Sequence, residues 1–250
     1  MQSSVVTLQS KLGQKWLSES TPKNQAMIDE YGKYGDMNTL SATITLLSLF
    51  NAIKVAPRVK MSESSSEEEF GRIQEKLFAG EKISISIEEM SSYQRKYIKK
   101  ESGEDKRIDL SEMEHLAMKL GFGTSLKFAS SDENPSKKLA EYISGDPSIR
   151  KVLQNADQFK SFICKRINVG VSGIIANYDK TILFKKEEES NKGAPIFSLL
   201  AACKDEYILL LDGGAQGPLW VHYKRFFEAM DKLDNRSGLP LGTLTIYELM

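Results

Sequence analysis

Several features are scarce in this chain, and each scarcity excludes a class of protein. The 250 residues include two cysteines and no CxxC pair, which argues against a disulfide framework or a structural zinc site. We therefore expect Cys164 and Cys203 to be reduced and mostly buried thiols. A surplus of one charge is also missing, because 34 basic residues balance 34 acidic ones. Any anion binding must then come from local patches rather than from the overall field.

Long apolar runs are missing as well. The most apolar helical stretch, residues 40–55, is interrupted by serine, threonine, asparagine and lysine, and it is too short to cross a bilayer. The first residues lack the charged segment followed by an apolar one that is typical of a signal peptide. The sequence therefore predicts no transmembrane segment and a cytoplasmic location.

Motifs for catalysis or cofactor binding are equally scarce. Neither His115 nor His222 belongs to an HxxxH or HExxH pattern, no GxxxxGK[ST] loop is present, and no GxGxxG follows a strand-like segment. The sequence therefore predicts no metal site, no cofactor and no catalytic residues. It favours a protein that is not an enzyme.

Helix signals dominate the first two-thirds of the chain. Apolar residues recur at helical spacing through residues 40–53, and Asp109 with Glu112 forms a capping box before another apolar periodic segment. Proline follows a capping residue at Pro22, Pro135 and Pro147, which predicts that helices begin there. The second and third of these helices are expected over about 135–144 and 147–154, and another over 157–167. Residues 82–88 alternate as a half-buried strand does.

From residue 169 the pattern changes to strands. We expect them at 169–176, 181–186, 196–203, 207–211, 219–222 and 244–247, with a turn at 177–180 and a helix over 223–233. The predicted fold class is α+β: a mostly helical N-terminal two-thirds followed by a small antiparallel β-meander with one helix. The predicted division is a mainly helical region, 1–168, and a meander plus helix, 169–250; a single fused domain fits nearly as well.

The segment 207–223 offers the best position for an enzyme site. Asp212, followed by two glycines, could place a carboxylate beside backbone amides, although the same residues make an ordinary turn. Cys203 and His222 could form a nucleophile–base pair if their strands were neighbours. A structural role for both is the better interpretation, because Cys203 lies in an apolar run. An enzyme with a site near Asp212 and His222 remains an alternative.

The strongest signal for ligand binding is a predicted helix over residues 93–100, which contains tyrosines and basic residues. Its positive side chains recur four residues apart, which gathers charge on one face, and its tyrosines could stack on bases while its cations meet phosphates. Basic residues are also frequent between 137 and 166. The predicted nucleic-acid-binding residues are Tyr93, Arg95, Lys96, Tyr97, Lys99, Lys100, Lys106, Arg107, Lys165 and Arg166.

These patterns favour a non-enzymatic RNA-binding or assembly protein of nucleocapsid or structural type. Its partners would be RNA or single-stranded nucleic acid, together with further copies of the same chain. A second alternative beside the enzyme is a protein–protein adaptor built on the C-terminal meander. That alternative predicts an exposed apolar patch in place of a basic groove.

Overall fold

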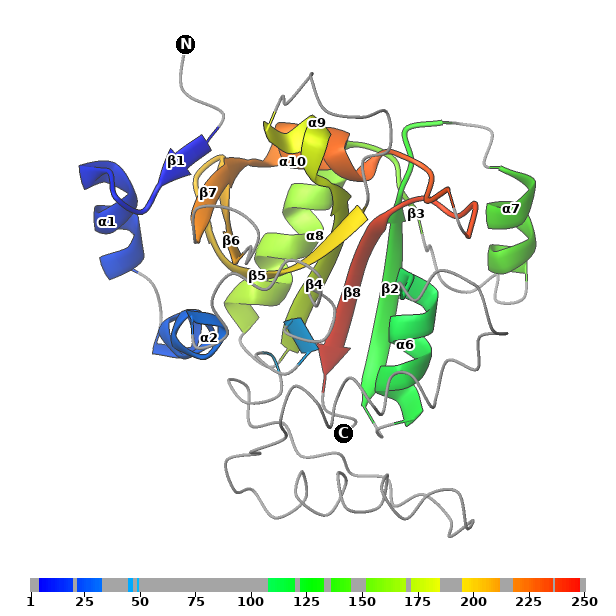
Figure 1. The fold of residues 1–250 in the computed structure, drawn as a ribbon, viewed down its shortest axis with the longest axis horizontal. Coiled ribbons are helices and arrows are strands. Elements are labelled where there is room, and N and C mark those ends of the chain that lie inside the picture. The colour runs from blue at the N-terminus through cyan, green and yellow to red at the C-terminus, as the bar shows by residue number, and fades with distance from the viewer. Residues whose placement is uncertain are drawn as a thin grey trace, which may run out of the picture.

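The structure, a computed structural model, describes residues 5–19, 22–32, 45–46, 49, 108–119, 122–132, 136–144, 152–169, 172–184, 195–211, 218–235 and 237–247. Its centre is one eight-stranded sheet with the strand order β1-β7-β6-β5-β4-β8-β2-β3 (Figure 1). The strands are β1 Val5–Thr7, β2 Gly123–Ala129, β3 Val152–Leu153, β4 Ser172–Asp179, β5 Pro195–Lys204, β6 Tyr207–Leu211, β7 Leu219–His222 and β8 Gly242–Tyr247. All neighbours are antiparallel except β2 and β3.

Helices cover both faces of this sheet. They are α1 Lys11–Ser18, α2 Pro22–Gly32, α6 Leu110–Lys119, α7 Lys137–Ser144, α8 Ala156–Val169, α9 Lys180–Phe184 and α10 Tyr223–Met230. Successive residues of a strand point to opposite faces, so Leu209 of β6 belongs to one hydrophobic core and Leu210 to another. The first core includes Trp16 of α1 and Met113 of α6, and the second includes Phe159 of α8. The fold is therefore a sheet between two helical layers.

The predicted fold class was wrong about the size and position of the sheet. Strand β1 lies near the N-terminus, and β2 and β3 lie within the region predicted to be mainly helical. The sheet thus takes strands from both sides of residue 168. The reason is that β8 pairs with β4 on one side and with β2 on the other. This pairing joins β2, which comes much earlier in the sequence, to the C-terminal strands.

Three local predictions were also wrong. Residues 181–186 were expected to form a strand, but α9 begins at Lys180, because the Asp179 carboxylate accepts hydrogen bonds from the Thr181 amide (2.8 Å) and hydroxyl (2.6 Å). This local cap overrides the β preference of Thr181 and Ile182. The expected turn at 177–180 begins inside β4, and the expected helix over 147–154 contains β3.

Several helices begin where the sequence predicted. The capping box before α6 is confirmed, because Asp109 Oδ1 accepts from the Glu112 amide and Glu112 Oε2 accepts from the Asp109 amide, both at 2.8 Å. Helix α2 begins at Pro22, and α7, α8 and α10 occupy expected helical segments. The predicted strand at 82–88 lies outside the described residues. No helix in the described ranges is long and apolar enough to span a membrane.

Candidate nucleic-acid interface

The structure describes two of the ten residues that were predicted to bind nucleic acid. Lys165 and Arg166 lie in the last turns of α8, whereas the eight residues from Tyr93 to Arg107 lie outside the described part of the chain. Cations near the C-terminal end of a helix also interact favourably with its dipole. The contacts around α8 therefore determine whether these two side chains are available to bind a ligand.

Helix α8 is fixed on the sheet by an apolar face. Asn155 precedes the helix, and its Oδ1 atom accepts a hydrogen bond of 2.9 Å from the Gln158 amide. Phe159, Ile163 and Ile167 recur at steps of four and are at most 9% exposed. This spacing buries one face against β4, β5 and α10 and leaves the flanks of the helix at the edge of the contact.

Two cations, one from α8 and one from β2, lie near a single aromatic ring on one flank of α8. The Arg166 guanidinium carbon lies 5.3 Å from the centroid of the Phe162 ring, and the Lys127 ammonium lies 5.8 Å from the same centroid. Both distances are within the range of cation–π attraction. Lys165, beside Arg166, is exposed. We call Lys127, Phe162, Lys165 and Arg166 the α8 basic cluster.

The sheet beside this cluster is polar. Lys127 and Ser125 of β2 are paired with Thr243 and Thr245 of β8, and all four alternate with residues of the opposite core. Thr243 and Thr245 are fully buried, and within the described part of the chain their hydroxyls have no hydrogen-bond partner. An unpaired buried hydroxyl costs about 1–3 kcal/mol. This part of the sheet thus departs from an ordinary apolar core.

The N-terminal half of α8 is occupied by a separate polar network. Lys160 Nζ forms a 2.5 Å ion pair with Glu206, and this hydrogen bond lowers the pKa of the Glu206 carboxyl. The Tyr223 hydroxyl donates to Asp157 Oδ1 at 2.7 Å, and that bond, followed by burial, raises the pKa of Tyr223 to about 12. Lys160 also lies 5.0 Å from the Tyr223 ring. Lys160 is therefore a structural residue, outside the α8 basic cluster.

Replacing Asp157 by asparagine should lower the pKa of Tyr223 from about 12 towards its ordinary value of 10.0. The raised pKa means that the folded state favours the neutral Tyr223 phenol. The stability that this phenol contributes is complete below pH 10 and is lost as the pH rises through about 12. The tyrosinate absorbance of the variant and of the original chain would be followed against pH, with Tyr223→Phe identifying the signal. An unchanged titration of Tyr223 would contradict the assigned hydrogen bond.

The proposed nucleophile–base pair does not form. Cys203 is bonded to Cys164 of α8 in a disulfide, so the expectation of two reduced thiols was wrong. His222 of β7 pairs with Tyr207 of β6, and Tyr207 pairs with Lys204 of β5. Cys203 is therefore on a strand that is not adjacent to β7, and it is one residue out of register with His222. His222 Nδ1 instead accepts from the Lys224 amide at 3.3 Å and caps α10. Asp212 lies outside the described residues.

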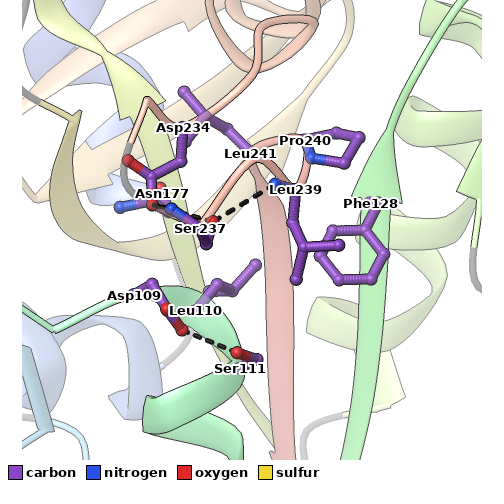
Figure 2. Close-up of a pocket in the computed structure, with 10 residues that line it drawn as sticks. All are labelled: Asp109, Leu110, Ser111, Phe128, Asn177, Asp234, Ser237, Leu239, Pro240 and Leu241. Carbon is purple, nitrogen blue, oxygen red and sulfur yellow. Dashed lines mark hydrogen bonds between the residues drawn. The ribbon is translucent and has the colours of Figure 1, made fainter. Parts of the chain in front are cut away.

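A small cavity lies where α6 begins, below the loop that leads into β8 (Figure 2). Its enclosed volume is about 10 Å³, roughly the room that one water molecule needs. Its lining residues are Asp109, Leu110, Ser111, Phe128, Asn177, Asp234, Ser237, Leu239, Pro240 and Leu241. Asp109 caps α6, and Asp234 Oδ2 accepts from the Ser237 hydroxyl at 2.9 Å. Both carboxylates therefore accept local hydrogen bonds that stabilise the nearby backbone. The cavity lies between the start of α6 and the loop that leads into β8.

Among the described residues, no group of three or more histidine, cysteine, aspartate or glutamate side chains could hold a metal ion. No protein-family model and no curated protein matches the chain. A function must therefore be argued from the arrangement of side chains alone.

Sequence reasoning identified half of the α8 basic cluster. Phe162 and Arg166 are four residues apart on a helix, and that spacing was a usable signal for their contact. Lys127 was missed, because it reaches the cluster only through the pairing of β2 with β8. No local pattern in the sequence connects residue 127 with residue 162.

Proposed function

We propose that this protein is a non-enzymatic binder of RNA or single-stranded nucleic acid, of nucleocapsid or structural type, and that the α8 basic cluster is part of its binding surface. The observation that carries the proposal is the placement of Arg166 and Lys127 around the Phe162 ring. A chain with no net formal charge needs such a local concentration of cations to attract a polyanion.

The chemistry of the cluster suits a phosphate backbone. Two like charges on one ring repel each other, and a bound phosphate between them would offset that repulsion. The Arg166 guanidinium presents a planar set of donors for phosphate oxygens and a flat surface on which a base can stack. Lys165 would extend the contact to a neighbouring phosphate. Such contacts position a strand without reading its sequence.

The proposal also includes the tyrosine–lysine segment, self-association and a location in the cell. The tyrosine–lysine segment from Tyr93 to Arg107 would supply additional phosphate and base contacts. Self-association would align several chains along one strand, as assembly proteins require. The location proposed for this activity is the cytoplasm.

The variant Lys165→Glu/Arg166→Glu should bind a single-stranded RNA oligonucleotide about 10-fold or more weakly at low ionic strength, because two cations become anions. Fluorescence anisotropy with a labelled oligonucleotide measures the affinity. The matched control is Lys11→Glu/Lys15→Glu, which makes the same change of charge on exposed positions of α1, a helix of the other layer.

The control separates local contacts from overall charge. If the proposal holds, the α1 variant keeps most of the affinity although its net charge is identical. Equal losses in both variants would show a response to total charge, and unchanged affinity in the α8 variant would remove the cluster from the binding surface. Circular dichroism of each variant checks that the helices remain folded.

A further inference from the structure

The two flanks of α8 are attached to the sheet by different means. An α-helix turns about 100° per residue, so Phe162 and Arg166, each two positions from Cys164, lie on the flank opposite to it. Cys164 is bonded to Cys203 of β5, with the two Cα atoms 5.5 Å apart. On the opposite flank, the Phe162 ring contacts Lys127 of β2. One flank is therefore held covalently, and the other by noncovalent contacts that include the cation–π pair.

We propose that the Cys164–Cys203 disulfide is a redox switch that controls the α8 basic cluster. This inference rests on the proposed function, because the property that it regulates is the binding of nucleic acid. Both cysteines are partly exposed, so a small thiol in solution can reach the bond. A chain that works in a reducing compartment would meet such thiols continuously.

The chemical step is a thiol–disulfide exchange with a dithiol reductant. One thiolate of the reductant attacks a sulfur of the Cys164–Cys203 bond and forms a mixed disulfide, and the second thiol of the reductant then displaces the remaining cysteine. The protein gains two electrons and two protons and ends with two thiols. The reductant loses the same electrons and protons and ends as a cyclic disulfide.

Breaking this bond leaves α8 docked but less firmly oriented. The apolar face of Phe159, Ile163 and Ile167 stays buried, and apolar contacts are non-directional. The other contacts described on the Cys164 flank are the Lys160–Glu206 ion pair and the Tyr223 hydrogen bond to Asp157, and both lie N-terminal to Phe162. The part of α8 that follows Lys160, which carries Phe162 and Arg166, can then shift away from Lys127.

The test measures the affinity of the full chain for a single-stranded RNA oligonucleotide before and after treatment with dithiothreitol. We expect the oxidised protein to bind about 5-fold or more tightly than the reduced protein, which is the range of a typical coupling between two sites. The Cys164→Ser/Cys203→Ser variant should bind as the reduced protein does and should not respond to dithiothreitol. Lys165→Glu/Arg166→Glu should bind weakly in both states.

The outcomes separate the switch from the proposed function. If the oxidised protein binds no RNA, the proposed function fails. If both redox states bind equally while thiol titration confirms reduction, the switch is overturned and RNA binding stands. Circular dichroism of the reduced wild-type chain measures whether the helices remain folded, and this measurement does not depend on the serine variant. Loss of binding that accompanies loss of helical signal would be unfolding and would also overturn the switch.

Discussion

Reduction of the Cys164–Cys203 disulfide is expected to lower the free energy of unfolding by about 4 kcal/mol, the loop-closure value for a bridge that spans 39 residues. The bond joins α8 to β5, so it closes a loop containing α9 and two strands of the sheet. Without it, the unfolded chain gains conformational freedom, whereas the buried faces of the folded chain are unchanged. The measurement is urea unfolding followed by circular dichroism, with and without dithiothreitol.

The matched control is the Cys164→Ser/Cys203→Ser variant. It should have the lower stability in both conditions and should show no response to the reductant. A total stability of about 5–15 kcal/mol is usual for a folded domain, so a loss of this size leaves most reduced molecules folded. If wild-type protein shows the same unfolding midpoint with and without reductant, the two thiols are not bonded in solution.

Replacing Gly242 by alanine is expected to destabilise the protein by about 3 kcal/mol, at the upper end of the usual cost of overpacking. Gly242 begins β8 and pairs with Phe128 of β2 and with Asn177 of β4. A methyl group there would collide with the Lys127 carbonyl oxygen and lie 2.9 Å from the Phe128 Cα atom. Backbone atoms of a paired strand cannot turn aside as a flexible side chain can, so β2 and β8 must separate.

Gly32 supplies the control for this substitution. It ends α2, and a methyl group added there would have no neighbour within 4 Å. Gly32→Ala should therefore be neutral or slightly stabilising, because alanine favours helix more than glycine does. Urea unfolding of the two variants measures the difference. Equal stabilities would contradict the close approach of β8 to β2.

Local signals made several of the helices predictable. The Asp109–Glu112 capping box and the proline at Pro22 depend on residues that are close in sequence, and the structure forms both as expected. The helix predicted over residues 157–167 likewise agrees with α8 to within two residues at each end. These features are determined by contacts between neighbours along the chain.

The sheet was not predictable in the same way. Strand β2 contains Leu126 and Phe128 alternating with polar residues, a pattern too short to be distinguished from a loop. Its identity as a strand depends on β8, which follows it by more than one hundred residues. The disulfide was missed for a related reason: two cysteines can bond only when the fold brings α8 and β5 together.

The candidate site combines both kinds of information. Lys165 and Arg166 were identified from the frequency of basic residues, whereas Lys127 entered only through strand pairing. Phe162 was not among the predicted binding residues, and its contact with two cations makes it part of the cluster. Composition thus indicated where positive charge gathers, and tertiary structure indicated which cations act together.

The salt dependence of RNA affinity tests the proposed function most directly. Each phosphate neutralised in a single strand contributes about 0.7 to the slope of log affinity against log salt concentration. The wild-type chain should show a steep slope, and Lys165→Glu/Arg166→Glu should reduce it by about 1.4, the value for two phosphates. The Lys11→Glu/Lys15→Glu control should keep the wild-type slope. Absence of salt-sensitive binding by the wild-type chain, or equal slopes in the wild-type chain and the α8 variant, would contradict the proposal.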